Sequence, residues 1–287
     1  MIRLIALLFV LFAPVAGATA KPAPSRIASG TVGSDEILLE LLQRPEDRRR
    51  LVAVSLFSED TRYSLLGPIP KSIPGRVGNN LEALLALKPD AAILASYSRL
   101  DLATQLRAAG VEVLIQDQFH SIADIQQNIL EIGRFTGSEK AAEALVTNLK
   151  TTLADLSRSF EGCPEAKRPR IMLYSDSGTF PGRNTSFDSA ARAAGLINLV
   201  AELGLTSWAP LSEEAIAGLK PDWIVMSGDA SKAQRLLEKL RGNKMWAQMP
   251  AVQKQHILAV PEALISTVSH HIAELAKTLH RAYSCGS

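Results

Sequence analysis

Hydrophobic residues follow two kinds of pattern that alternate along most of this chain. Short apolar runs rich in β-branched residues, such as Leu51–Ser55, are typical of buried strands. Stretches with apolar residues three and four apart, such as Leu81–Leu87, are typical of amphipathic helices. Strands that alternate with helices predict parallel sheets. The predicted strands are 26–29, 51–55, 91–95, 111–115, 170–174, 223–227 and 256–260, and the helices around them are 34–42, 81–87, 102–109, 187–194, 232–240 and 272–283.

The segment between residues 121 and 160 breaks this alternation and predicts two consecutive helices. Ser121 and Asp124 have the spacing of a helix-capping box, and Gly137 interrupts the helical pattern. After Gly137, one apolar stripe predicts a helix of about 23 residues, which is about 35 Å long and can cross a whole domain. The stripe consists of Ala142, Leu145, Leu149, Leu153, Leu156 and Phe160.

These patterns predict an α/β fold with two Rossmann-like α/β lobes joined by a single long backbone helix. The predicted parts are an N-terminal lobe at 21–120, connecting helices at 121–162 and a C-terminal lobe at 163–287. An internal echo supports two matching units, because Leu81–Asp90 resembles Glu213–Asp222. Both segments end in Lys-Pro-Asp before an apolar strand, and proline stops the helix in each.

The first 20 residues have the pattern of a secretory signal peptide. Arg3 precedes the apolar run Leu4–Ala16, and a small-residue Ala-Thr-Ala sequence ends at Ala20. The alternative is a membrane anchor, although the run is shorter than the roughly 20 residues that a spanning helix needs. We predict cleavage after Ala20 and a soluble periplasmic protein that begins at Lys21, with no cysteine there to carry a lipid.

Composition and motifs narrow the classes of function. The 31 Lys and Arg residues nearly balance 29 Asp and Glu, so the net charge of +2 disfavours a nucleic-acid partner. Only His120 of five histidines lies in the N-terminal lobe, which disfavours a bare metal ion held by both lobes. Gly30–Ser34 lacks the lysine of a phosphate-binding loop, and no Gly-x-Ser-x-Gly motif is present. An exported α/β hydrolase with degenerate motifs is the enzymatic alternative.

The two cysteines leave two alternatives open. Cys163 and Cys285 are too few for a disulfide-dense scaffold, but an oxidising compartment allows them to form one bridge. The sequence alone cannot place the two residues within the few Å that a disulfide needs. A bridge and two free thiols therefore both remain possible at this stage.

Several motifs together resemble the helical-backbone periplasmic binding proteins, the class III substrate-binding proteins of ABC importers. The strongest match is Val77-Gly78 followed by Asn80-Leu81-Glu82 and Leu87-Lys88-Pro89-Asp90. Further matches are 26–29 with 35–38, 182–188 and 211–214, whereas Asp35 replaces the family's usual threonine. The resemblance implies a monomeric receptor that carries a cobalamin-type corrinoid or a ferric siderophore, or alternatively haem, to a membrane permease. It implies no resident cofactor and no metal site.

The resemblance also implies two docking residues. In the family, one glutamate of each lobe contacts arginines of the permease, and Glu82 and Glu214 fall on those positions. The alternative is a pair of solvated glutamates, which are common in a first helical turn. A signalling subunit of the same fold is a further alternative for the whole chain.

Ligand contacts are expected in loops at the carboxyl ends of the strands. Aromatic rings there can cover a flat macrocycle, and arginines can pair with acidic groups of a chelate. The alternative for each position is an ordinary loop residue. The candidates are Phe57, Arg76, Tyr97, Phe180, Arg183 and Asn184.

Overall fold

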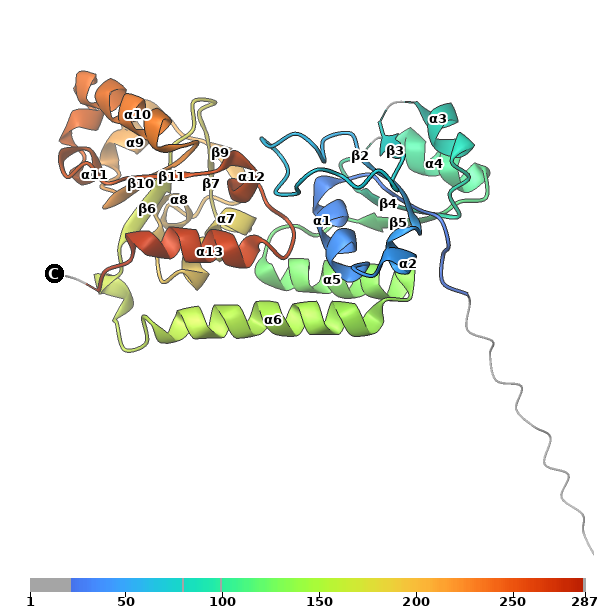
Figure 1. The fold of residues 1–287 in the computed structure, drawn as a ribbon. Helices are drawn as coiled ribbons and strands as arrows, with labels where there is room; N and C mark the ends of the chain where they lie inside the picture. Colours follow the sequence, from blue (N-terminus) through green and yellow to red (C-terminus); the bar gives the residue numbers. More distant parts are fainter. Residues whose placement is uncertain (1–21, 79, 99, 286–287) are drawn as a thin grey trace, which may run out of the picture.

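The computed structural model describes residues 22–78, 80–98 and 100–285. Two α/β lobes lie side by side, and one long helix runs beneath both of them (Figure 1). This arrangement confirms the predicted fold class. The predicted signal peptide and its cleavage site lie outside the described residues. Within those residues no helix is both long and apolar enough to cross a membrane.

The N-terminal lobe is built on a five-stranded parallel sheet with the strand order β3-β2-β1-β4-β5. Every residue of β2 and β4 is buried, which explains their unbroken apolar runs. The strands are β1 (Ile27–Ser29), β2 (Leu51–Ser55), β3 (Gly75–Val77), β4 (Ala91–Ala95) and β5 (Glu112–Gln116), and the helices are α1 (Val32–Leu41), α2 (Pro45–Arg48), α3 (Leu81–Ala86) and α4 (Leu100–Ala108).

The C-terminal lobe is built on a four-stranded parallel sheet with the order β11-β10-β6-β8, and β7 and β9 form a separate antiparallel pair. Its strands are β6 (Arg170–Leu173), β7 (Thr179–Pro181), β8 (Ile197–Asn198), β9 (Trp208–Pro210), β10 (Trp223–Ser227) and β11 (Ile257–Val260). Its α-helices are α7 (Ser186–Ala193), α8 (Leu199–Glu202), α9 (Glu213–Gly218), α10 (Ala230–Gly242), α11 (Pro250–Gln253), α12 (Glu262–Ile265) and α13 (Ile272–Leu279), with 3-10 turns η1 (Glu165–Lys167), η2 (Trp246–Gln248) and η3 (His280–Ala282).

The connecting segment consists of α5 (Ile122–Thr136) and α6 (Glu139–Arg158). Ser121 and Asp124 form both hydrogen bonds of the predicted capping box, and Gly137 ends α5 with a left-handed φ of 67°. The 20 residues of α6 make it about 30 Å long. The helix ends at Arg158, before Phe160, whose ring packs on Tyr283 of the C-terminal lobe.

One hydrophobic core passes through both lobes and the helices beneath them. It contains strand residues of both sheets, such as Ile93 and Val225, together with the buried faces of α5, α6 and α13. Ala142, Leu145 and Leu149 of the predicted stripe are buried in it. The lobes are therefore joined by packing as well as by the chain.

The far end of α6 is fixed to the C-terminal lobe. The ring of Phe160 lies 5.7 Å from that of Tyr283, and His280 hydrogen-bonds the carbonyl oxygen of Ala194 at 2.8 Å. Beside them Cys163 and Cys285 form a disulfide with their Cα atoms 5.9 Å apart. The structure thus decides between the two alternatives for the cysteines in favour of the bridge.

The internal echo has a structural explanation in its two aspartates. The carboxylate of Asp90 accepts the backbone N–H of Arg26 at 2.9 Å, and the backbone N–H of Asp90 donates to the carbonyl oxygen of Arg26. Asp222 makes the same two interactions with Arg170, in each case at 2.8 Å. Each aspartate therefore fixes the beginning of the strand beside its own, β1 in one lobe and β6 in the other.

Removing the disulfide should destabilise the protein. Because 122 positions separate the two cysteines, replacing both in Cys163→Ser/Cys285→Ser should lower the free energy of unfolding by about 2–5 kcal/mol. Denaturant unfolding followed by circular dichroism measures this. A reductant should lower the midpoint of the wild type and leave that of the variant unchanged. Equal midpoints for oxidised wild type and variant would show that the bridge contributes no stability.

Candidate functional site

Two neighbouring cavities lie at the cleft, the first lined by residues of both lobes and the second by residues of the C-terminal lobe alone. The first has a volume of about 460 Å³ and the second about 600 Å³, and Ser266 lines both. Both volumes fall in the range of roughly 300–1,000 Å³ that is common for small-molecule sites. We call the first the aromatic cavity and the second the cationic cavity, after the side chains described next.

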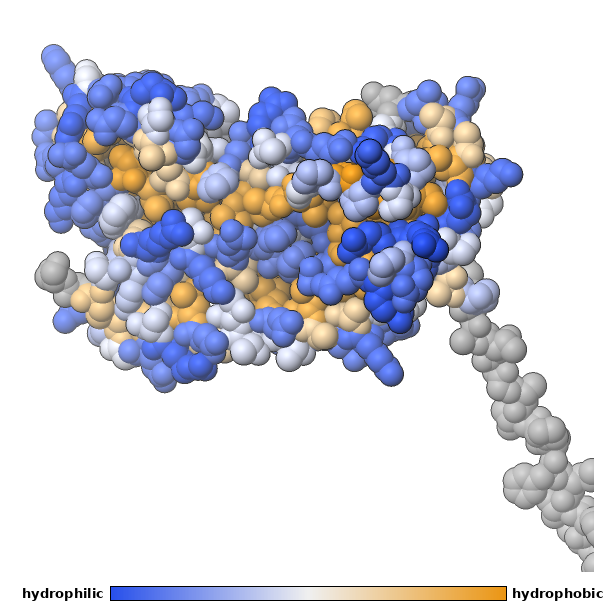
Figure 2. Space-filling view, in the orientation of Figure 1, coloured by the Kyte–Doolittle hydropathy of each residue, from blue (hydrophilic) through white to orange (hydrophobic). Residues whose placement is uncertain are grey.

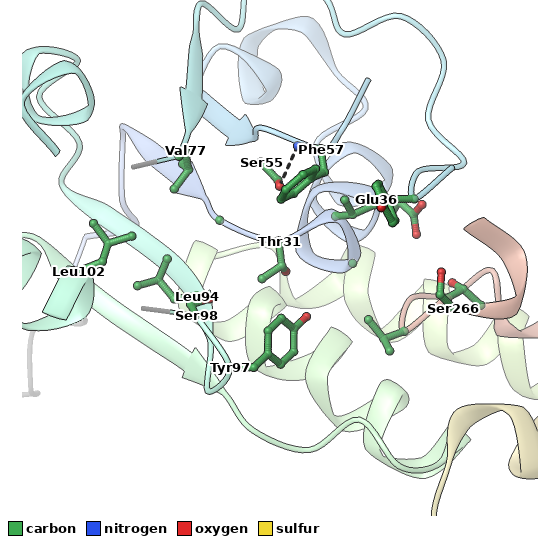
Figure 3. A pocket seen from close by; sticks show the side chains of 17 residues that line it. Thr31, Glu36, Ser55, Phe57, Val77, Leu94, Tyr97, Ser98, Leu102 and Ser266 are labelled. Atoms are coloured by element: carbon green, nitrogen blue, oxygen red, sulfur yellow. Dashed lines mark hydrogen bonds between the residues drawn. The ribbon is translucent and has the colours of Figure 1, made fainter. Parts of the chain in front are cut away.

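The aromatic cavity is formed at the carboxyl ends of β1, β2 and β4. Phe57 and Tyr97 follow β2 and β4, and 53% and 68% of their respective surfaces are exposed. Tyr63 extends this wall, with its ring 5.6 Å from that of Phe57 in an edge-on arrangement. Figure 3 shows Phe57 and Tyr97 on either side of Thr31, which follows β1. Exposed rings around an apolar cavity can hold a flat, largely apolar ligand.

Two adjacent carboxyl groups of α1 hold the loop that carries Phe57 and Tyr63. Asp35 is fully buried and accepts the backbone N–H of Ser55 at 2.9 Å and the hydroxyl of Ser58. Glu36 lines the aromatic cavity and accepts the backbone N–H of Leu65 at 3.0 Å. Burial raises the pKa of both carboxyl groups, and that of Asp35 reaches about 8.

The C-terminal lobe closes one side of the aromatic cavity by direct contact. The second carboxylate oxygen of Glu36 accepts a hydrogen bond from the hydroxyl of Ser269. Gly33 lies so close to the same loop that a Cβ atom on it would be 2.7 Å from a methyl carbon of Val268. The first turn of α1 therefore approaches the C-terminal lobe only because residue 33 has no side chain.

The cationic cavity belongs to the C-terminal lobe. Three cations of α10 line it at positions 232, 235 and 239, a spacing that places them along one face of the helix. The exposed ring of Trp208 lies in the same wall. The amino group of Lys239 contacts Asp176 at 2.9 Å and the Tyr174 hydroxyl at 3.0 Å, and these contacts raise the pKa of Lys239 above its usual range.

Among the predicted ligand contacts, Phe57 and Tyr97 lie in a cavity wall, and the other four do not. Arg76 is held in β3 by an ion pair with Glu59 at 2.8 Å. Phe180 is only 2% exposed in the core of the C-terminal lobe. Burial contradicts the prediction for Phe180, whereas Arg76 is engaged in an ion pair and its contact with a ligand stays a prediction.

Arg183 and Asn184 also lie outside both cavities. The guanidinium of Arg183 donates to the carbonyl oxygen of Ala201 at 2.9 Å. The backbone of Arg183 also forms an isolated β-bridge with Thr206. Asn184 has a left-handed φ of 57° directly before Thr185, the N-cap of α7. Both residues serve the local turn, and ligand contact there stays a prediction.

Sequence analysis missed most of the C-terminal wall. The α10 cations directly follow the carboxyl end of β10 and recur every three or four residues, a signal that was available from the sequence. Trp208 lies in a strand of only three residues, which no periodic pattern marks. The missed cavity residues include Thr31, Gly33, Glu36, Tyr63, Tyr174, Trp208, Lys232, Arg235, Lys239 and Val268.

The predicted docking glutamates occupy matching positions. Glu82 lies in the first turn of α3 and Glu214 in the first turn of α9, and both are exposed. Asn80 and Ser212 cap the two helices in the same way, each accepting the backbone N–H three residues on. Figure 1 shows α3 and α9 in the upper parts of their lobes, on the side away from α6.

Metal-binding side chains do not cluster in the described part of the chain. Across residues 22–78, 80–98 and 100–285, no group of three or more His, Cys, Asp or Glu residues is arranged to hold a metal ion. Burial of His270, together with the charge of the neighbouring His271, lowers the pKa of His270 to about 4. The described cavities therefore offer rings, hydroxyl groups and cations to a ligand.

Comparison with known proteins shows the family. A family model described as periplasmic binding protein matches residues 27–264, so this chain belongs to that family. The family membership predicted from the motifs is thereby confirmed. The assignment also agrees with the two-lobe architecture and with an exported chain.

Individual relatives are more distant. A cobalamin-binding protein of Halobacterium salinarum is 29% identical over 215 residues, which cover 73% of this chain but only 55% of the relative. A possible iron-binding periplasmic protein of Staphylococcus epidermidis has a TM-score of 0.75 at 22% identity, covering 91% of this chain and 99% of its own. The heme-binding protein HutB of Vibrio cholerae has a TM-score of 0.72 at 24% identity, covering 89% and 97%. The two solved structures show a shared fold.

The buried proton of Asp35 should make stability depend on pH. The folded chain holds this proton up to about pH 8, whereas an ordinary aspartate releases it near pH 3.8. Between these values the folded state binds more protons than the unfolded state, so this group makes stability fall as the pH rises, by up to about 1.4 kcal/mol per pH unit.

The variant Asp35→Asn cannot titrate and should lose less stability than the wild type between pH 5 and pH 8. Denaturant unfolding at both values measures the difference. Asp155→Asn, at an exposed position of α6, controls for the change in charge. An unchanged pH dependence in Asp35→Asn would contradict the assignment of the proton to Asp35.

Proposed function

We propose that this chain is the substrate-binding protein of an ABC importer and that it captures a metal chelate between its lobes. The chelate is a corrinoid, a ferric siderophore or haem. The protein is exported with cleavage after Ala20, acts as a monomer and holds no cofactor of its own. Family membership and the names of the relatives support this proposal.

The observation that carries the ligand proposal is the aromatic cavity between the lobes. Phe57, Tyr63 and Tyr97 leave large parts of their rings uncovered, at 53%, 43% and 68% exposure. Exposed rings gathered on one apolar cavity are unusual on a surface without a partner. A macrocyclic chelate would cover them and exchange water for ring contacts.

Delivery to the permease rests on Glu82 and Glu214. One exposed anion on each lobe can pair with cations of a membrane partner, and two such contacts fix both its position and the spacing of the lobes. Because the long helix holds the lobes together, the two anions present a nearly constant spacing to the partner.

Ligand binding should raise the melting temperature. A panel of cyanocobalamin, haemin and several ferric siderophores should contain at least one compound that raises Tm by about 5 °C at a hundredfold excess over Kd, because it binds only the folded state. The shift is measured by thermal unfolding. Phe57→Ala/Tyr97→Ala should keep the Tm of the free protein and lose most of the shift. A panel without any response would contradict the proposal.

Reversing the charge of both docking glutamates should abolish uptake and leave ligand binding intact. In Glu82→Arg/Glu214→Arg, cations would face cations of the permease, which costs several kcal/mol at an interface. Transport is measured in cells or in proteoliposomes that contain the permease. A single substitution should weaken uptake less than the double variant.

The matched control is Glu139→Arg, which changes an exposed glutamate in the first turn of α6, away from α3 and α9 (Figure 1). It should transport at the wild-type rate. If the double variant also did so, the two glutamates would be solvated helix residues without a role in docking.

A further inference from the structure

The two walls of the cleft differ in chemistry. On the N-terminal side, Phe57, Tyr63 and Tyr97 present rings, and apolar residues such as Val77 and Leu94 lie behind them. On the C-terminal side, cations of α10 line the adjoining cavity. In the view of Figure 2, hydrophilic residues gather over the region of α10.

Two of these cations are available to a ligand. Lys239 is already engaged by Asp176, whereas Lys232 and Arg235 have no carboxylate in ion-pair contact within the described part of the chain. Both side chains are exposed, and Arg235 donates one hydrogen bond to the neutral hydroxyl of Ser231. Their charges therefore remain uncompensated by direct contact.

Two carboxylates lie near these cations without an ion-pair contact to them in the described part of the chain. Asp229 caps α10 by accepting the backbone N–H of Lys232 at 2.8 Å, and its charge also acts on Lys232 and Arg235. Glu262 also lines the cationic cavity. Lys232 and Arg235 thus leave the cavity wall with a positive edge beside the exposed ring of Trp208.

We propose that the ligand is a flat macrocyclic chelate with a carboxylate or phosphate group, whose ring lies against Phe57 and Tyr97 while its anionic group binds Lys232 and Arg235. This inference rests on the proposed function and narrows it to one class of ligand. Ser266 lines both cavities, so the two adjoin. Arginine and lysine bind such oxygens through charge-assisted hydrogen bonds.

Two pairs of probes distinguish the possible sources of the anion. Haemin carries two carboxylates, and its dimethyl ester carries none. Cyanocobalamin carries one phosphodiester, and dicyanocobinamide lacks it. Titration of the full chain by absorption or fluorescence gives Kd for each. The wild type should bind the anionic member of one pair about tenfold or more tighter than its partner.

Lys232→Gln/Arg235→Gln should remove that preference and bind both members of the pair with similar affinity. Lys239 is left unchanged, because its removal would leave the carboxylate of Asp176 without its cation. The control is Arg241→Gln, an exposed cation of the same helix that lines neither cavity. It should keep the wild-type preference. Circular dichroism and Tm establish that all variants fold.

The outcomes separate this inference from the proposed function. The assigned anion site is wrong if the wild type shows no preference in either pair, or if the double variant keeps the preference. Neither result would contradict the proposed function as a chelate receptor. If no probe and no siderophore binds the wild type, the proposed function as a chelate receptor is wrong, and so is the anion site that rests on it.

Discussion

An apolar layer that belongs to neither lobe alone determines how this molecule is built. Side chains of α5 and α6, including Ile132 and Leu149, pack into the same core as strands of both sheets. A straight helix of about 30 Å cannot shorten, so it holds the lobes at a nearly constant separation. Closure of the cleft is then limited to small rotations that keep this layer packed, because well-packed interiors resist sliding.

The cleft depends on that fixed separation. Gly33 and Val268 can touch, and Glu36 can accept a hydrogen bond from Ser269, only because the core beneath them holds the lobes at this separation. The same separation lets the aromatic cavity take residues from both lobes and adjoin the cationic cavity at Ser266. Each wall alone would be an ordinary surface of a Rossmann-like lobe.

How far the sequence predicted this structure varied with the strength of each local pattern. Strands β2, β4 and β10 were predicted to the residue, because buried parallel strands are unbroken apolar runs. Strands of two or three residues, such as β8, carry no periodicity and were missed. In the site, Phe57 and Tyr97 were found because they follow such strong strands. Phe180 was misplaced because packing, which local sequence does not encode, turns its ring into the core.

The α10 cations show a second limit of sequence analysis, because a charged helix face has the same spacing whether it meets solvent or a cavity.

The echo between the lobes was informative in part. Asp90 and Asp222 recur for an architectural reason, since each fixes the start of a neighbouring strand. That reason does not extend to Glu82 and Glu214, whose side chains are exposed in both lobes.

The disulfide also has a topological consequence. It joins the residue just beyond α6 to a residue beyond η3, so the C-terminal lobe lies within one covalent ring from Cys163 to Cys285. A protease that cuts one peptide bond inside this ring opens a loop but releases no fragment. The two pieces stay attached until a reductant reaches the bridge. A nicked molecule would therefore keep all of its residues, gain only the mass of one water, and hold both walls of the cleft on one covalent framework.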